Sequence, residues 1–427
     1  MKTTTLLLGI CAVLATTATH AADWPRFRGP NADGSTSEKG LPLKWSEREN
    51  LIWRTELPGP GSSSPIIVGN VVYLTCYSGY GADVKSPGDP AGLTRHAICL
   101  NRADGKILWK KDVKLSTPDK AYTGTYITQH GYASSTPVSD GKNVYFFFGP
   151  AGVYAYSIRG EELWHVNVGE KAHDWGNGAS PILHGDLLIV NAALEGDNLV
   201  ALDKKTGKEV WSVRGGLPAS WNTPVIATVN GREELIVNAS GKLRAFDPAT
   251  GKELWNCRSI RGAELCPSVV VHDGIVFVIG VPGTGNAMAV KAGGSGDVSA
   301  TNVLWEIKSG SNVSSPIYLD GHVYWANDSR GTLHCVKAET GEMVFEQPLS
   351  KERGNRVYAS PILSEGRLYY VSRNQGTFVV AAKPKFELLE HNVIAGDDSV
   401  FNATPAIADG QIYLRSDKFA YCIGKRR

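Results

Sequence analysis

The chain repeats one short closing sequence, and this repeat constrains the fold more than any other feature. The segment VALDKKTGKEVW ends at Trp211, AFDPATGKELW ends at Trp255 and ICLNRADGKILW ends at Trp109. A repeat of this kind indicates a small structural unit that cannot bury its own apolar face and must stack on copies of itself. The period of the repeat therefore has to be established before any functional residue is sought.

Eight prolines, each opening a β run, mark the starts of the copies. They stand at positions 65, 137, 181, 224, 267, 316, 361 and 405, at intervals of 72, 44, 43, 43, 49, 45 and 44 residues. Each copy continues with a Gly-containing turn and a second β run, then a third run, another Gly turn and a fourth run that holds Trp or a large apolar residue. The pattern predicts one four-stranded antiparallel sheet per copy.

A four-stranded unit of about 44 residues is typical of the blade of a β-propeller. The last copy has room for only three strands after Pro405, whereas an additional fourth strand, LIWRTEL at 51–57, stands before Pro65. We therefore predict an all-β fold, an eight-bladed β-propeller of four-stranded antiparallel blades, with its ring closed by the N-terminal strand that completes the last blade. The 47 Gly and 22 Pro residues suit such a succession of short strands and turns.

We expect three regions along the chain: a signal peptide at 1–21, an N-terminal extension at 22–50 and the propeller at 51–427. The first region has Lys2, an apolar stretch from Leu6 to Ala15 and a small residue at Ala21, as a cleaved secretory signal does. A lipoprotein signal ending at Cys11 is the alternative. No later segment is apolar over the roughly 18 residues that a membrane span needs, so we expect an exported, periplasmic or secreted protein.

The net charge bears on the class of binding partner, and the cysteine content bears on disulfide bonds. The 44 basic and 42 acidic residues give a net charge of +2 without a basic run before the last three residues, which argues against nucleic acid as a partner. Six cysteines follow the signal, and export permits disulfides. Cys257 and Cys266 close a short loop between two predicted strands and form the expected bridge, while the other thiols are as readily buried and unpaired.

Two insertions lengthen the first copy on one face of the predicted propeller. They cover residues 77–94 and 112–134, and they predict either a lid or a partner-binding rim, or loops that merely cover the channel mouth. The rim candidates are Tyr80, Tyr122, Tyr126, His130 and Tyr132. A third insertion, 291–302 (KAGGSGDVSATN), falls on the opposite face and has the composition of a flexible loop.

A further group of polar and aromatic residues precedes the innermost strands or lies in loops on the same face as the two insertions. These residues could surround a polar or anionic small molecule in the channel, or line a water-filled funnel. They are Asp174, Trp175, Asn177, Glu195, Trp221, Asn222, Glu264, Arg330, Tyr358, Arg373 and Asn402. The histidines show no spacing typical of a zinc site, and no residue is assigned a catalytic role.

The TGKxxW closings and the small-residue-Pro openings, together with WPRFRGPNADG at 24–34, resemble the PQQ-repeat, quinoprotein-dehydrogenase-like family of propellers. The resemblance implies one of two functions: a dehydrogenase that binds pyrroloquinoline quinone (PQQ) with Ca²⁺ in the channel, or a BamB-like scaffold without catalytic activity. The larger dehydrogenases of the family hold the quinone against a Trp and a ring of adjacent cysteines. This chain has no adjacent cysteine pair and no C-x-x-C-H haem motif.

The leading hypothesis is therefore an exported, monomeric binding or assembly scaffold of the cell envelope that engages protein partners at the rim or a small polar ligand in the channel. The alternative is a PQQ-dependent quinoprotein oxidoreductase, of the alcohol or sugar dehydrogenase type, that uses PQQ and Ca²⁺ in the central channel. Trp175, Glu195, Asn222 and Glu264 are the residues that keep this alternative open, because a quinone site needs an aromatic face and calcium needs hard oxygen ligands.

Overall fold

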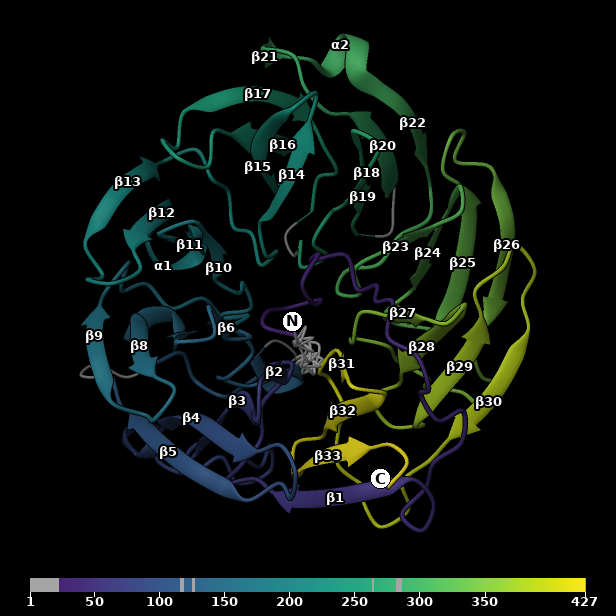
Figure 1. Ribbon diagram of the computed structural model, residues 1–427. Helices are drawn as coiled ribbons and strands as arrows, with labels where there is room; N and C mark the ends of the chain where they lie inside the picture. Colours follow the sequence, from purple (N-terminus) through teal and green to yellow (C-terminus); the bar gives the residue numbers. More distant parts are fainter. Residues whose placement is uncertain (1–22, 116–118, 125–126, 263–264, 282–285, 427) are drawn as a thin grey trace, which may run out of the picture.

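Eight antiparallel sheets stand around a central channel in the computed structural model, which describes residues 23–115, 119–124, 127–262, 265–281 and 286–426 (Figure 1). Seven of the described sheets have four strands and one has five. The prediction of an eight-bladed all-β propeller is confirmed. The predicted signal peptide lies outside the described residues, and within them no helix is long and apolar enough to cross a membrane.

The first four blades follow one another along the chain, each beginning with its innermost strand. Their strands are β2 (Ile66–Val68), β3 (Val71–Ser78), β4 (Thr94–Asn101) and β5 (Ile107–Val113) in blade 1; β6 (Val138–Ser139), β7 (Asn143–Phe147), β8 (Val153–Ser157) and β9 (Glu162–Val166) in blade 2; β10 (Ile182–His184), β11 (Leu187–Ala192), β12 (Asn198–Asp203) and β13 (Glu209–Arg214) in blade 3; and β14 (Val225–Val229), β15 (Arg232–Ala239), β16 (Lys242–Phe246) and β17 (Glu253–Arg258) in blade 4.

The other four blades complete the circle. Their strands are β18 (Val270–His272), β19 (Ile275–Ile279), β20 (Ala287–Lys291) and β22 (Val303–Ile307) in blade 5; β23 (Ile317–Leu319), β24 (His322–Ala326), β25 (Thr332–Lys337) and β26 (Met343–Pro348) in blade 6; β27 (Ile362–Ser364), β28 (Arg367–Val371), β29 (Thr377–Ala381) and β30 (Leu388–Asn392) in blade 7; and β31 (Ala406–Ala408), β32 (Gln411–Arg415), β33 (Phe419–Ile423) and β1 (Leu51–Glu56) in blade 8.

Blade 8 joins the two ends of the propeller. Strand β1 pairs antiparallel with β33 in a register that places Trp53 opposite Cys422 and Thr55 opposite Ala420. This pairing satisfies the backbone groups along β33 that an open ring would leave unpaired. The predicted ring closure is therefore confirmed, and it depends on residues far apart in the sequence.

The closing Trp of the repeat contacts the next blade. In five of the blades its indole Nε1 donates a hydrogen bond to a main-chain oxygen in the turn before the fourth strand of the following blade; these bonds join Trp53 to Arg102, Trp109 to Ile158, Trp164 to Lys204, Trp211 to Pro248 and Trp305 to Ala338, at 2.8–3.2 Å. The six-membered ring or pyrrole edge of each Trp lies against the Gly of that same turn. The closing Trp thus links five of the blades to their neighbours, which accounts for its repetition.

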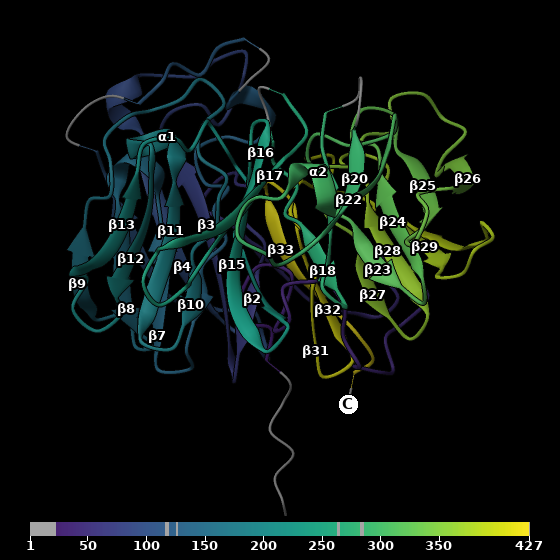
Figure 2. The ribbon, with the colours of Figure 1, turned by 90° about the horizontal axis from the view of Figure 1, so that it is seen from above.

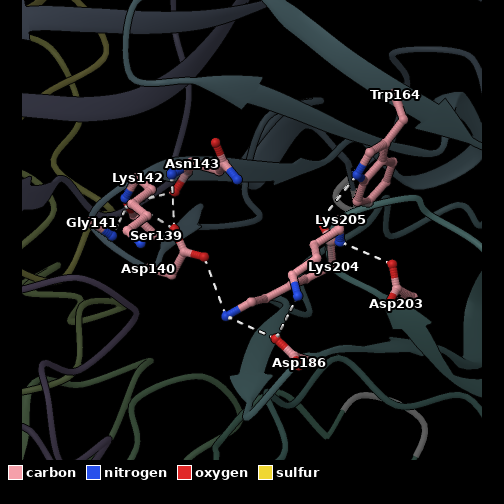
Figure 3. A network of polar contacts seen from close by, with 10 residues as sticks. All are labelled: Ser139, Asp140, Gly141, Lys142, Asn143, Trp164, Asp186, Asp203, Lys204 and Lys205. Atoms are coloured by element: carbon pink, nitrogen blue, oxygen red, sulfur yellow. Dashed lines mark hydrogen bonds and ion pairs between the residues drawn. The ribbon is translucent and has the colours of Figure 1, made fainter.

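Figure 3 shows this contact between blades 2 and 3. The indole of Trp164 reaches the main-chain oxygen of Lys204 at 3.1 Å, and the Lys204 ammonium extends back toward blade 2, 3.3 Å from an Asp140 carboxylate oxygen. The Asp203 carboxylate accepts hydrogen bonds from the main-chain nitrogens of Lys205 and Thr206, which fixes the turn that the indole contacts.

Blade 4 departs from this rule, and the insertion 291–302 explains why. Here Trp255 donates to the carboxylate of Glu234 at 2.7 Å, because the insertion replaces the Gly turn of blade 5. The expectation of a flexible loop is wrong: residues Gly296–Asp297 form β21, which pairs in parallel with β17, and α2 (Ser299–Asn302) follows as one short turn. The insertion adds a fifth strand to blade 4.

The predicted disulfide is also wrong. Cys257 and Cys266 are not bridged. Cys257 lies on β17, at the outer side of blade 4, and is packed in the core between blades 4 and 5. Cys266 lies at the inner side, where it lines the central cavity. The two cysteines are close in sequence, but Cys257 lies on the fourth strand of the blade and Cys266 at the channel wall.

The two faces of the propeller carry different coverings. Residues 23–50, which we call the strap, run beneath the channel and bond to the innermost strands of two blades: Trp24 pairs with Ile67 in β2, and Ser35 with Leu363 in β27. The long loops that follow β3 and β5 lie on the opposite face (Figure 2). We call the described residues of these loops, 79–93 and 114–134, the lid. The channel is thus covered from both ends.

Candidate functional site

A belt of hydroxyl groups joins the blades at the channel wall. In each step, the main-chain nitrogen of a Ser or Thr donates to the side-chain oxygen of the equivalent residue in the next blade. The order is Ser64, Thr136, Ser180, Thr223, Ser268, Ser315, Ser360 and Thr404, with seven hydrogen bonds of 2.9–3.1 Å between them. These residues are buried, so each of the seven accepting hydroxyls satisfies a backbone donor that water does not reach.

The belt corrects the alignment of blade 5. In the other seven blades the belt residue immediately precedes the proline of the repeat. In blade 5 the belt residue is Ser268, which follows Pro267. The equivalent of the other prolines is therefore Val269, and Pro267 stands two positions too early. The hydroxyl, rather than the proline, is what all eight copies share.

A cavity of about 130 Å³ occupies the channel between the strap and the lid. Aromatic side chains from Phe27, Trp175, Trp221 and Tyr358 line it together with belt hydroxyls and the amides of Gln129 and Asn402. Among the described lining residues none carries an acidic side chain, and His130 is the only titratable base. The cavity can thus hold a ligand with one ring that makes both apolar and hydrogen-bonding contacts.

Four of the residues predicted for the channel come together there. Trp175, Trp221, Tyr358 and Asn402 line the cavity, and the guanidinium of Arg373 stacks on the Tyr358 ring with its carbon 4.2 Å from the ring centre. Trp221 is held in place by a 2.9 Å hydrogen bond from its indole nitrogen to the main-chain oxygen of Gly176.

The remaining channel candidates lie elsewhere. Asn222 is buried and donates to the Ser220 hydroxyl at 2.6 Å, which gives it a structural role. Asp174 is exposed beside Lys120 at 3.2 Å, and Arg330 is exposed in the turn between β24 and β25. These residues precede strands or occupy turns as predicted, but they are not among the residues that line the channel cavity. Glu264 lies outside the described residues.

Asn177 and Glu195 meet in a second, smaller pocket beneath the lid. The Asn177 amide donates to a Glu195 carboxylate oxygen at 3.1 Å, and the buried ion pair of Arg95 and Asp119 lines the same pocket. Burial raises the pKa of Glu195 to about 7, while the hydrogen bond from Asn177 opposes the shift. Glu195 is therefore placed to hold a proton near neutral pH, away from the main cavity.

The rim tyrosines are buried and do not face a partner. Tyr80, Tyr122 and Tyr132 pack on one another with ring centres 5.9–6.4 Å apart, and each is at most 7% exposed. Tyr77 joins the same cluster, and the Tyr80 hydroxyl accepts a hydrogen bond from the main-chain nitrogen of Tyr122 at 2.8 Å. The predicted rim contacts thus form the core of the lid. Tyr126 lies outside the described residues.

His130 lies in the lid and faces the cavity. Its Nε2 donates to the main-chain oxygen of Trp175 at 2.5 Å, which leaves Nδ1 to accept from the Ser134 hydroxyl at 2.6 Å. Burial lowers the pKa of His130 to about 4, because a charged imidazolium would lose its hydration. The ring is therefore neutral and ties the lid to the connection between blades 2 and 3.

Gln129 ties the lid to the other side of the channel, and the sequence did not single it out. Its side-chain oxygen accepts hydrogen bonds from Arg356 (3.1 Å) and Arg373 (2.9 Å). Its main-chain oxygen accepts from Arg373 (2.8 Å) and Asn402 (2.9 Å). Arg356 was missed as well, although it stands two residues before Tyr358 on the same connection. That proximity is the signal that could have identified it.

The donor set of the cavity does not fit PQQ with calcium. Calcium binds several oxygen ligands that include carboxylates, and the described lining provides hydroxyls and amides but no carboxylate. Glu195, the buried acid that was expected there, is bonded to Asn177 in the second pocket. No cluster of three or more His, Cys, Asp or Glu side chains positioned for a metal ion occurs within the described ranges.

Comparison with known proteins identifies the family to which the sequence is similar. Residues 94–347, more than half of the chain, match the family described as outer membrane protein assembly factor BamB. A tetrathionate hydrolase from Acidithiobacillus ferrooxidans is 22% identical over 386 residues, which cover 85% of this chain and 64% of that enzyme. This chain therefore spans less than two thirds of the length of that relative.

Solved structures share the propeller at low sequence identity. BamB from Moraxella catarrhalis superposes with a TM-score of 0.59 at 13% identity, over 88% of this chain and 98% of that one. Quinohemoprotein alcohol dehydrogenase from Comamonas testosteroni superposes with a TM-score of 0.58 at 13% identity, over 95% of this chain and 81% of that one. Such identities show the fold alone. Given the family match and the eight repeated blades, this chain belongs to the BamB-type family of PQQ-repeat β-propellers.

Proposed function

We propose that this chain is an exported binding scaffold of the cell envelope, and that a protein partner docks on the outer surface of its lid. The observation that carries the proposal is the cluster of Tyr77, Tyr80, Tyr122 and Tyr132, which holds two long loops together as one packed layer. A surface that is ordered before binding loses little conformational entropy when a partner docks. The family match to an assembly factor agrees with a role in binding.

The exposed side of the lid is suited to loop-to-loop docking. Residues 82–86 and 88–91 are exposed and are mostly small or polar, with Val84 61% exposed among them. Peptide addition to an inner strand is disfavoured because these strands have only two to five residues and face a channel that the strap and the lid cover. A partner would therefore contact the lid through its side chains and loop backbone.

The proposal is tested by site-specific photo-crosslinking in cells that produce the protein. A crosslinking residue at position 84 is expected to yield one discrete adduct. The same residue at position 205, an exposed lysine on the opposite face with a side chain 69% exposed, is the matched control and should yield none. Identical adducts from both positions, or no adduct from position 84, would contradict docking on the lid.

The oxidoreductase alternative receives its own measurement. Purified protein is titrated with PQQ in the presence of Ca²⁺ while the melting temperature and the Trp fluorescence are followed. We expect no saturable change in either signal, because the described cavity offers no carboxylate for calcium. A ligand that binds the native state at 100 times its Kd would add about 2.7 kcal/mol to the free energy of unfolding, so a saturable rise would favour the enzyme over the scaffold.

A further inference from the structure

Two guanidinium groups converge at the lid without a carboxylate in ion-pair contact, although the carboxylate of Asp417 attracts Arg373 from farther away. Arg356 and Arg373 both stack on the ring of Tyr358, at 5.0 and 4.2 Å from its centre. Their described hydrogen bonds go to Gln129 and to the Tyr358 hydroxyl, and among the described residues no carboxylate lies within ion-pair distance of either. The Nε of Arg373 is buried and has no hydrogen-bond partner there. Two neighbouring cations in a partly buried place repel each other unless an anion binds between them.

The geometry around Gln129 is that of a carboxylate site occupied by a neutral residue. Arg373 directs its two Nη groups at two different oxygens of Gln129, the side-chain oxygen at 2.9 Å and the main-chain oxygen at 2.8 Å. This two-pronged contact is how arginine binds the two oxygens of a carboxylate. Arg356 and Asn402 each add one donor, so that each oxygen accepts two hydrogen bonds.

We propose that Arg356, Arg373 and Asn402 form a binding site for a carboxylate at the channel mouth, and that Gln129 of the lid occupies this site until such a ligand displaces it. The site lies at the edge of the cavity, because Gln129 and Asn402 also line it. The body of the ligand would enter the space between Trp175, Trp221 and Tyr358. The proposal goes beyond docking on the lid and stands even if no protein binds there.

The exchange of Gln129 for a carboxylate is favourable on electrostatic grounds. A carboxylate adds a charge–charge attraction to the hydrogen bonds that the two guanidinium groups already make to a neutral amide oxygen, and partial burial strengthens this attraction. The size of the cavity, about 130 Å³, suits a carboxylate attached to a single ring; an engineered apolar cavity of about 150 Å³ holds benzene. The ligand class is therefore a small monocarboxylate, either free or at the end of a polypeptide.

The first test places the carboxylate within the chain itself. In Gln129→Glu the new side chain should bind both arginines, raise the melting temperature and abolish binding of an added carboxylate. In Gln129→Ala the side-chain oxygen is removed, which frees the donors of Arg356 and of one Nη of Arg373 while the main-chain oxygen stays in place, and the affinity for phenylacetate should rise about tenfold or more over that of the wild type. Arg330→Gln, which changes an exposed arginine of the same face, is the matched control and should bind phenylacetate as the wild type does.

The second test compares probes by calorimetric titration at constant ionic strength. Phenylacetate is expected to bind to Gln129→Ala, whereas the neutral phenylacetamide is not. Gly-Gly-Phe with a free C-terminus, compared with its C-terminal amide, shows whether a polypeptide end is accepted as well as a free acid. Binding of acid and amide with equal affinity, equally tight binding of sulfate, or a lowered melting temperature of Gln129→Glu would each overturn the proposal.

Discussion

The ring of Trp211 lies against Gly251 of the next blade so closely that a Cβ atom at Gly251 would be 2.5 Å from the Cε3 of the indole. Gly251 also has a φ of +71°, and Gly274 has almost the same φ, +72°, with no atom within 4 Å of where its Cβ would stand. The two glycines therefore allow the effect of the ring contact to be separated from that of backbone conformation.

Gly274→Ala is expected to lower the free energy of unfolding by about 1–2 kcal/mol, the cost of a left-handed backbone for alanine. Gly251→Ala should lower it by about 2–4 kcal/mol, because the indole must also move. Urea denaturation followed by circular dichroism measures both. Equal losses in the two variants would show that the contact between Trp211 and Gly251 does not restrict the turn.

The hydroxyl belt predicts that replacing the hydroxyl of a belt threonine by a methyl group destabilises the fold more than removing its methyl group does. Thr223→Val keeps the shape of the side chain but leaves the main-chain nitrogen of Ser180, which bonds to the Thr223 hydroxyl at 3.0 Å, without an acceptor. A buried unsatisfied donor costs about 1–3 kcal/mol, whereas Thr223→Ser retains the hydroxyl and should cost less. Thermal unfolding of the two variants checks the order, and a Ser variant less stable than the Val variant would contradict the role of the belt.

The tyrosine cluster predicts that the lid can be loosened without unfolding the propeller. Tyr80→Ala removes a ring that contacts Tyr122 and Tyr132, and it also removes the acceptor for the Tyr122 nitrogen. Hydrogen exchange of residues 79–93 and 119–124 should accelerate, while strands of blades 4 to 6 stay protected. Tyr80→Phe keeps the ring and should give an intermediate effect. Faster exchange throughout all the blades would instead assign the cluster to the global core.

The raised pKa of Glu195 predicts that the free energy of unfolding depends on pH. Burial raises its pKa from an ordinary value near 4.5 to about 7, so the folded chain keeps a proton that the unfolded chain has already released. The free energy of unfolding should therefore fall as the pH rises from about 4.5 to 7, by about 3 kcal/mol at most. Glu195→Gln, which can still accept from Asn177, should remove this loss.

The measurement is denaturant unfolding of both proteins between pH 4.5 and pH 8. The stability of Glu195→Gln relative to the wild type should grow across this window. Glu170→Gln, a change at an exposed glutamate, is the control and should follow the wild-type curve. A constant difference between Glu195→Gln and the wild type at all pH values would contradict the raised pKa.

The fold was predictable because the same strand and turn pattern occurs eight times at similar intervals in the sequence. Strand pairing, blade number and closure through residues 51–57 all depend on local patterns that recur, and each recurrence supports the others. The position of Ser268 shows the limit of this reasoning: proline is easy to recognise, but the hydrogen bond between blades is made by the hydroxyl beside it.

The site was predictable only in part, because it depends on contacts across the ring. Trp175, Trp221, Tyr358 and Asn402 were found from their place before the inner strands. Gln129 could not be found in this way, since its partners come from blades 7 and 8 and no repeat position encodes them. The rim tyrosines were assigned to the surface because loops are usually exposed, whereas this lid is long enough to have a small core of its own.

The pairing of β1 with β33 also bears on how the chain reaches its native state. Synthesis delivers β1 before any other blade strand and β33 after all of them, so β1 must remain without its partner until the ring is otherwise built. During that time Trp53 and the apolar positions of β1 lack the strand β33 on which they pair in the native fold. Closure of the ring thus requires a long-range contact, which is slow to form, and a chaperone that shields the first strand would protect the chain from aggregation until this contact is made.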